Sequence, residues 1–209
     1  ADGLVCGTMG RFHDHFAVME EVIGYNNPEK EAFAMNALIS NKGNFFIADT
    51  YINENPTAEQ LANGTLMCAA EMKRFGLKPK VALVSNTNYG SNRNPDANKM
   101  QQALELIREL DPALEIDGEM QADVALDETM RKSIFPETTL SGAANLLVMP
   151  NVEAANISYN LLRVNATNGI TVGPILMGLN KPVQIVTPIS TVRRIVNMIA
   201  LAAVDAQRQ

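Results

Sequence analysis

Short apolar segments alternate with amphipathic helical patterns along this 209-residue chain, and this alternation restricts the possible folds more than any other feature. Buried strands are predicted at residues 44–49, 81–85, 146–149 and 183–186. Helices are predicted between and after these strands, at residues 57–75, 99–110, 154–164 and 191–206. Strands that alternate with helices at this spacing favour an α/β fold built on a largely parallel sheet.

The composition supports a globular chain, with 46% hydrophobic and 19% charged residues. No apolar run reaches the roughly 18–20 residues needed to cross a bilayer, and no signal-peptide pattern is visible at the N-terminus. The two cysteines, Cys6 and Cys68, provide no disulfide framework. We therefore expect a cytoplasmic protein with two reduced thiols and no membrane partner.

The net charge of −6 argues against nucleic acid as a partner. The charge is unevenly distributed, because residues 151–209 carry five basic and two acidic side chains, a local net charge of +3, which leaves −9 on the remainder. A positive C-terminal quarter suits a small polyanion. The same charges could instead lie on solvated helix faces.

Polar segments follow three of the predicted strands, at residues 49–55, 85–91 and 187–191. In parallel α/β sheets, ligands bind in the crevice beyond the carboxyl ends of the strands. We therefore expect these three segments to converge on one binding site.

The second of these segments offers several hydrogen-bond donors to an anion. Its candidate ligand-binding residues are Ser85, Asn88, Gly90 and Ser91. Arg93, just beyond, could neutralise a phosphate or be exposed. Alternatively, the polar side chains of this loop bond their own backbone in an ordinary strand-to-helix connection.

Gly173 and Pro174 lie in a glycine-containing segment whose backbone must approach either a ligand or a neighbouring helix closely. Lys181 follows as a candidate phosphate partner, because an ammonium group is a compact charge. His13 and His15 form a His-x-His pair, but no further ligand pattern supports it, and we expect no metal site. The standard nucleotide-binding fingerprints are absent.

Five segments, in the same order, resemble the phosphate acetyltransferases, which move an acetyl group between phosphate and coenzyme A (CoA). These segments are residues 1–7, 53–62, 85–91, 115–118 and 172–183. The resemblance implies a three-layer α/β/α fold of the isocitrate/isopropylmalate dehydrogenase type with two lobes. Residues 1–27 and 186–209 would form a first lobe that is incomplete in this chain, and residues 28–185 would form the second lobe.

The chain departs from the family at the positions that carry the chemistry. In the family that this chain resembles, the sequence Leu-Ser-Arg-Gly follows the last strand. An aspartate lies six residues beyond that arginine and is the expected base. Here Thr187 and Pro188 stand at the serine and arginine positions, and Arg194 stands at the aspartate position. Proline cannot replace a guanidinium group, and arginine cannot accept a proton near neutral pH. We therefore expect no catalytic residues and a site that has lost acyl transfer.

Three further segments resemble one branch in particular, the acetyltransferase-like domain of large bacterial malic enzymes. They are residues 47–51, 152–160 and 187–197. This resemblance implies a domain that binds acetyl-CoA as an effector, helps to form a homodimer or higher homo-oligomer, and contains no cofactor of its own. NAD(P) and a divalent metal would belong to an N-terminal malic enzyme domain of the same polypeptide. The implied ligand-binding residues are Arg11, Arg163, Lys181, Arg193, Thr187 and Ser190, together with the loop and glycine residues above.

Two alternatives remain open at this point. The chain could be an active phosphate acyltransferase whose catalytic groups have moved. It could also be an assembly module without a ligand, because the closing helix carries apolar side chains that suit either an interface or a core. These side chains are Met198, Ile199, Leu201 and Val204.

Overall fold

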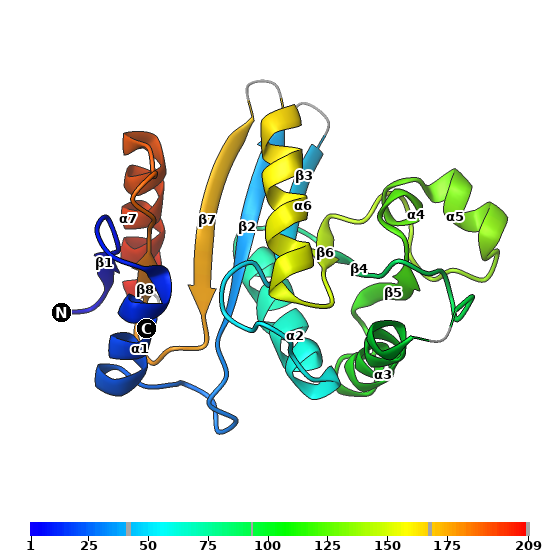
Figure 1. The fold of residues 1–209 in the computed structure, drawn as a ribbon, viewed down its shortest axis with the longest axis horizontal. Coiled ribbons are helices and arrows are strands. Elements are labelled where there is room, and N and C mark those ends of the chain that lie inside the picture. The colour runs from blue at the N-terminus through cyan, green and yellow to red at the C-terminus, as the bar shows by residue number, and fades with distance from the viewer. Residues whose placement is uncertain (41–42, 93, 167–168, 208–209) are drawn as a thin grey trace.

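The computed structural model describes residues 1–40, 43–92, 94–166 and 169–207 (Figure 1). Arg93, a candidate of the sequence analysis, lies outside these residues. The strands are β1 (Leu4–Cys6), β2 (Phe33–Ser40), β3 (Gly43–Ala48), β4 (Lys80–Val84), β5 (Glu115–Met120), β6 (Leu146–Val148), β7 (Ile170–Met177) and β8 (Val183–Ile185). The helices are α1 (Phe12–Val22), α2 (Ala58–Arg74), α3 (Pro95–Leu110), α4 (Ala122–Leu126), α5 (Glu128–Ile134), α6 (Val152–Asn165) and α7 (Val192–Ala206).

A mostly parallel six-stranded sheet forms the centre of the molecule, with strand order β5-β4-β6-β3-β2-β7. The strands β5, β4, β6 and β3 pair in parallel. Only β2 runs against its two neighbours, β3 and β7. The predicted α/β class with a largely parallel sheet is confirmed.

Helices cover both faces of this sheet, and each face has its own core. On one face, α2 and α3 pack with alternate strand residues such as Leu83 and Leu146. On the other face, α6 and α4 pack with the intervening residues, including Ile47 and Leu147. This alternation follows from the period-2 geometry of strands, which sends neighbouring side chains to opposite faces.

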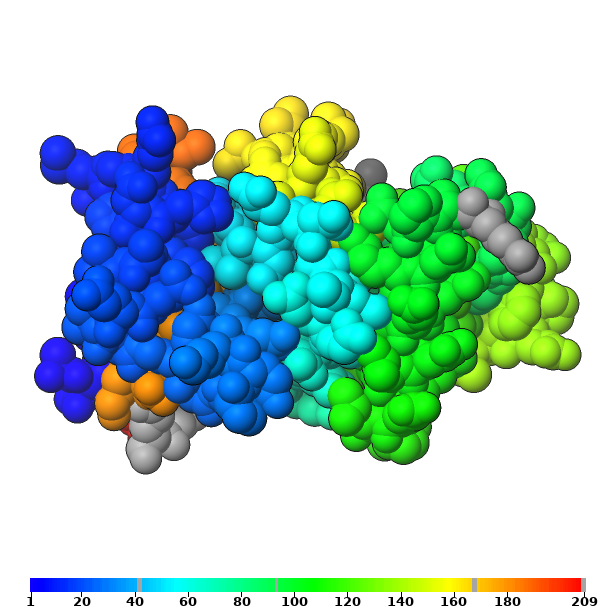
Figure 2. Space-filling view, turned by 60° about the horizontal axis from the view of Figure 1, so that its bottom comes forward, coloured from blue at the N-terminus to red at the C-terminus, as the bar shows by residue number. Residues whose placement is uncertain are grey.

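A separate two-stranded parallel sheet, β1-β8, lies at one end of the molecule together with α1 and α7 (Figure 1). Figure 2 shows the same arrangement in space-filling form, with the N-terminal residues at one end and the residues around α3 and β5 at the other. Helix α7 also reaches the main core, because Met198 and Leu201 pack in the cluster that contains α2 and α3. The division into two lobes at residues 27–28 and 185–186 stays a prediction.

The strands and helices predicted from the sequence are all present, with small shifts at their ends. Helix α2 begins as expected, because the Thr57 hydroxyl accepts from the backbone N–H of Gln60 and the Gln60 side chain accepts from the backbone N–H of Thr57. At the start of α7, the Thr191 hydroxyl accepts from the backbone N–H of Arg194, without a reciprocal side-chain bond. Caps of this kind satisfy backbone N–H groups that have no partner within the helix.

The sequence analysis missed β2, β5, β7, α1, α4 and α5. Strand β2 contains four residues with good helix propensity and a buried asparagine, so neither its composition nor its pattern indicates a strand. It becomes a strand because β3 and β7 pair with it on both sides. Within the described residues, no helix has the length and apolar character needed to cross a membrane.

Candidate ligand-binding site

A cavity of about 480 Å³ opens between the start of α1, the segment after β3 and the start of α6. We call it the Tyr51 cleft. It is lined by Phe12, His13, Thr50, Tyr51, Val152, Glu153, Asn156 and Ile157. Because α1 belongs to the predicted first lobe and the other two segments to the second, the cleft lies where the predicted lobes meet.

The walls of the Tyr51 cleft are largely apolar, and its floor is polar. The rings of Phe12 and Tyr51 lie against each other, with their centroids 4.7 Å apart. Ile157 is 53% exposed and adds an aliphatic wall. On the floor, the Thr50 carbonyl accepts a hydrogen bond of 3.4 Å from Asn156 Nδ2. This combination suits a ligand with a small apolar part and a few polar atoms.

Asp49 fixes the shape of the segment that carries Thr50 and Tyr51. Its buried carboxylate accepts hydrogen bonds from the backbone N–H groups of Tyr51, Ile52 and Asn53 at 2.9–3.1 Å, and from Asn53 Nδ2 at 2.7 Å. Burial raises the pKa of Asp49, while these hydrogen bonds act in the opposite direction. The carboxylate therefore acts as an internal anchor for the loop rather than as a group that faces the cleft.

Arg194, the residue at the expected base position, lies behind the floor of the cleft and is only 6% exposed. Its Nε donates to the carbonyl of Gly173 at 2.5 Å, and its Nη2 donates to Oδ1 of Asn36 at 3.2 Å. Asn36 in turn donates from Nδ2 to Oγ1 of Thr50 at 2.7 Å. No carboxylate forms an ion pair with Arg194 among the described residues.

Two positive charges act on the side of the cleft formed by Tyr51. Burial raises the pKa of the Tyr51 hydroxyl, and the charges of Arg194 and Arg163 act in the opposite direction. Arg163 comes from α6, where its guanidinium lies 5.8 Å from the centre of the Tyr159 ring. Cations from two helices therefore act on this wall, and the carboxylate of Glu153 also lines the cleft.

The close approach predicted at Gly173 is to a strand, although the sequence had suggested a ligand or a helix. Gly173 lies in β7 with φ = +130°, and a Cβ atom there would lie 2.6 Å from Oδ1 of Asn36 in β2. Pro174 follows it as a buried strand residue. Only glycine combines this backbone conformation with such a short separation.

The loop at residues 85–91 lies apart from the Tyr51 cleft. Ser85 lines a second cavity, of about 560 Å³, at the ends of β4 and β6. The other candidates bond to their own surroundings: the backbone N–H of Gly90 donates to Glu119 at 3.0 Å, and Ser91 Oγ accepts from the backbone N–H of Asn88 at 3.1 Å. The Ser91 bond is of the kind expected for an ordinary strand-to-helix connection, whereas the Gly90 bond reaches the side chain of Glu119 in β5.

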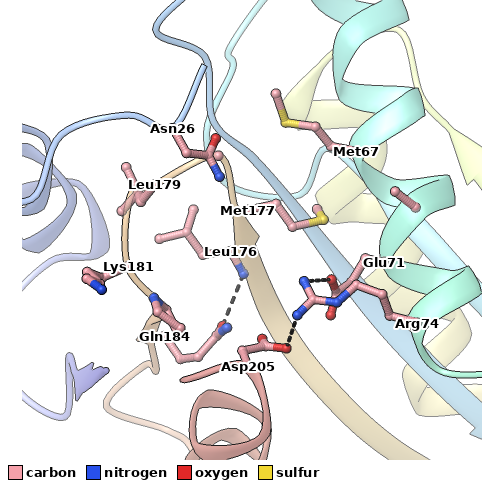
Figure 3. Close-up of a pocket in the computed structure, with 13 residues that line it drawn as sticks. Asn26, Met67, Glu71, Arg74, Leu176, Met177, Leu179, Lys181, Gln184 and Asp205 are labelled. Carbon is pink, nitrogen blue, oxygen red and sulfur yellow. Dashed lines mark hydrogen bonds and ion pairs between the residues drawn. The ribbon is translucent and has the colours of Figure 1, made fainter. Parts of the chain in front are cut away.

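Lys181 lines a third cavity, of about 200 Å³, between α2, β7 and the end of α7 (Figure 3). Arg74 crosses this cavity and pairs with Glu71 at 3.0 Å and with Asp205 at 2.8 Å. Gln184 closes one side by accepting from the backbone N–H of Leu176 at 3.1 Å. Ser85, Lys181 and the Tyr51 cleft are therefore three distinct locations.

Thr187 and Ser190 occur together in the turn before α7. Their hydroxyl oxygens lie 3.2 Å apart, and Ser190 Oγ accepts from the backbone N–H of Thr187 at 3.0 Å. Pro188 between them is exposed, as are Arg193 and Arg11. The expectation that three polar segments meet at one sheet edge is wrong for this turn, because β8 pairs with β1 and not with the main sheet.

The described residues contain no group of three potential metal ligands. His15 Nε2 lies 2.5 Å from the carbonyl oxygen of Met9, so this ring nitrogen has a partner within the chain.

Sequence reasoning missed Phe12, Thr50, Tyr51 and Asn156, which line the Tyr51 cleft. It also missed Asn36, which bonds to Thr50. A signal was present for three of them, because residues 47–51 and 152–160 carried the resemblance to the malic enzyme branch. Asn36 gave only the weaker signal of one polar residue inside an apolar segment.

Comparisons with known proteins agree with this architecture. The sequence pattern of the phosphate acetyl/butaryl transferase family matches residues 1–203. An NADP-dependent malic enzyme from Escherichia coli is 57% identical over the whole chain, which spans 28% of that protein's length. A phosphate acetyltransferase from Corynebacterium glutamicum is 34% identical over 99% of the chain and 62% of its own length.

The solved structures lead to the same family. A phosphotransacetylase from Streptococcus pyogenes superposes with a TM-score of 0.93 at 29% identity, and this chain covers 64% of it. The EutD phosphotransacetylase from Staphylococcus aureus superposes with a TM-score of 0.85 over 63% of its length. By sequence pattern over nearly its whole length, and by fold, this chain belongs to the phosphate acetyl/butaryl transferase family.

Proposed function

We propose that this chain is a phosphotransacetylase-like regulatory domain of a malic enzyme, the class of enzyme that oxidatively decarboxylates malate to pyruvate with NAD(P). The domain binds acetyl-CoA or a related CoA ester in the Tyr51 cleft and does not catalyse acyl transfer. Malic enzymes that are 45–57% identical to this chain support the proposal that it is part of a malic enzyme. NAD(P) and the divalent metal would be bound by the rest of that polypeptide.

The position of Arg194 is the observation that carries this proposal. A general base must hold a lone pair within hydrogen-bond reach of the proton that it removes. Arg194 has no such lone pair, and its guanidinium is engaged with Gly173 and Asn36 behind the cleft floor. Pro188, at the position of the anion-binding arginine, is exposed and has no charged group. Binding a CoA ester needs neither group.

The shape and charge of the Tyr51 cleft support a ligand of this class. Its apolar walls fit a short acyl group, and the positive charges of Arg163 and Arg194 favour the phosphates of CoA nearby. Arg11 lies immediately before α1, Arg193 lies in the first turn of α7, and both are exposed. We propose that these two side chains contact the phosphates of CoA. Regulation then requires that acetyl-CoA bind two arrangements of the whole enzyme unequally, by about 1–3 kcal/mol in typical cases.

Calorimetry on the full-length protein tests the proposal directly. We expect saturable binding of acetyl-CoA and a change in the rate of malate oxidation when acetyl-CoA is added. Because linkage is reciprocal, saturating malate and cofactor should also shift the affinity for acetyl-CoA. Absence of binding, or binding that leaves malate oxidation unchanged, would overturn the regulatory assignment.

The first alternative, an active acyltransferase, predicts release of CoA from acetyl-CoA that depends on added phosphate. We expect the full-length protein to match the buffer control in this assay. A phosphate-dependent rate above that control would support relocated catalytic groups instead.

The second alternative, an assembly module, is favoured by the outer face of α7. Val192, Val196 and Ile199 are 79%, 57% and 51% exposed on this helix, whereas Met198 and Leu201 belong to the core. The double substitution V196E/I199E tests this face while leaving the core intact, with V22E on α1 as a control for an exposed apolar residue. A smaller mass in solution for the α7 variant alone would support assembly through this face.

A further inference from the structure

We infer that Thr50 is the residue that recognises the acyl carbonyl of the CoA ester, through a hydroxyl donor that Asn36 and Arg194 aim into the Tyr51 cleft. The inference rests on the proposed function, because it concerns how that site distinguishes a thioester from other forms of CoA.

Arg194 fixes the orientation of the Asn36 amide. A guanidinium group has five N–H donors and no acceptor, so the Asn36 atom that lies 3.2 Å from Arg194 Nη2 must be the carbonyl oxygen. The amide NH₂ of Asn36 therefore faces Thr50, and Nδ2 lies 2.7 Å from Oγ1. The orientation of this amide follows from the chemistry of its two neighbours.

The direction of this hydrogen bond leaves the Thr50 proton without an acceptor. Thr50 Oγ1 accepts from Asn36, so its own O–H must point elsewhere, and no described residue accepts a hydrogen bond from it. Thr50 is 1% exposed and lines the Tyr51 cleft. A buried donor without an acceptor is costly, and an oxygen atom of a ligand on the cleft floor would remove that cost.

The thioester carbonyl oxygen of a CoA ester fits this donor. The Arg194 charge polarises Asn36, which in turn polarises Thr50, so the three groups form a cooperative chain that ends at the ligand. The apolar side chains of Phe12, Val152 and Ile157 surround the position that the acyl methyl group would occupy. Free CoA ends in a thiol, which is only a weak acceptor and gains little from this arrangement.

The test compares ligands that differ only at the carbonyl. Calorimetry with the full-length protein would use acetyl-CoA, free CoA and the ethyl thioether of CoA, which has the same chain length but no carbonyl oxygen. We expect acetyl-CoA to bind about 10-fold more tightly than the thioether, as is typical for one hydrogen bond to an otherwise unpaired buried group. T50V, which keeps the shape of the side chain and removes the hydroxyl, should lose this preference by weakening acetyl-CoA binding alone.

Three further variants separate recognition from structural effects. T50S keeps the hydroxyl and should keep the preference. T65V removes another fully buried hydroxyl, which donates to the Leu61 carbonyl at 2.6 Å within α2, and should also keep the preference. N36D replaces the amide by a carboxylate, which pairs with Arg194 and accepts the Thr50 proton. It should abolish the preference although Thr50 is still present, and it keeps the inference testable if T50V fails to fold.

The outcomes distinguish the inference from the proposed function. If the wild-type protein binds acetyl-CoA and the thioether equally, or if T50V weakens both equally, then Thr50 does not read the carbonyl, although CoA binding itself stands. If the wild-type protein binds none of the three ligands, the proposed function fails and the inference falls with it.

Discussion

Arg194 in α7 donates a hydrogen bond of 3.2 Å to Asn36 in β2, although 158 positions separate the two residues in the sequence. The same guanidinium also bonds the carbonyl of Gly173 in β7. The closing helix is thereby joined to β2 and β7. Arg194, which stands at the position where the family resemblance led us to expect a base, therefore forms part of the scaffold.

Replacing Arg194 should lower the stability of the domain. R194M leaves Asn36 Oδ1 and the Gly173 carbonyl without their donor, at a cost of about 1–3 kcal/mol, while removal of a buried charge offsets part of it. The neighbouring R193M is a matched control, because Arg193 is exposed and should change stability by less than about 0.5 kcal/mol. Urea unfolding of both variants provides the measurement, and equal midpoints would contradict a scaffold role for Arg194.

Gly173 should tolerate alanine less well than another glycine with positive φ. Gly173 and Gly76 have φ values of +130° and +76°, so alanine is strained at both positions. A Cβ at Gly76 meets no atom within 4 Å, and G76A should cost about 1 kcal/mol. A Cβ at Gly173 meets Oδ1 of Asn36 at 2.6 Å, so G173A should cost about 3 kcal/mol or more. Thermal unfolding of both variants compares the two positions, and similar losses would contradict the prediction.

Arg131 should be among the positions at which substitution lowers the stability of the domain most. It is fully buried, and its guanidinium donates to the carbonyls of Val124, Ala125, Leu140 and Gly142. R131M should destabilise the domain by about 3 kcal/mol or more, since three buried carbonyls and the half-buried Gly142 carbonyl lose their donor.

The adjacent Lys132 provides the control for Arg131. Lys132 is 58% exposed in its ion pair with Glu128, so K132M should cost less than about 1 kcal/mol. Chemical denaturation would compare the two, and a mild effect of R131M would show that water satisfies those carbonyls.

Glu115 should contribute to stability at neutral pH and lose that contribution in acid. Burial alone would raise its pKa, but Lys78 and Ser141 outweigh burial and lower the pKa to about 2 from the ordinary 4.5. Because the folded state has the lower pKa, the contribution is present above about pH 4.5 and disappears as the pH falls toward 2.

The pH dependence of thermal unfolding tests this assignment. Between pH 5 and 2.5, E115Q should lose less stability than the wild type, since it has no carboxylate to protonate. E109Q, at an exposed position of α3, should follow the wild-type curve. If the stability of E115Q and that of the wild type fall in parallel with pH, the prediction is contradicted.

Local sequence signals were sufficient for much of the fold. The strands β3, β4 and β6 each contain a short apolar segment. Thr57 and Thr191 cap their helices through groups only three residues away. Strand β2 could not be found in this way, because its pairing partners, and not its composition, hold it extended. Strand β7 was missed for another reason, since Gly173 and Pro174 interrupt its β-branched segment.

The sequence by itself determined the family and the α/β class, since both depend on residue identities in order along the chain. Only the tertiary structure decided the site. Asn36, Thr50 and Arg194 contact one another through hydrogen bonds that span 14 and 158 residues, and such bonds form only after the strands and α7 have packed. The orientation of the Asn36 amide, and hence the free proton of Thr50, follows from that packing.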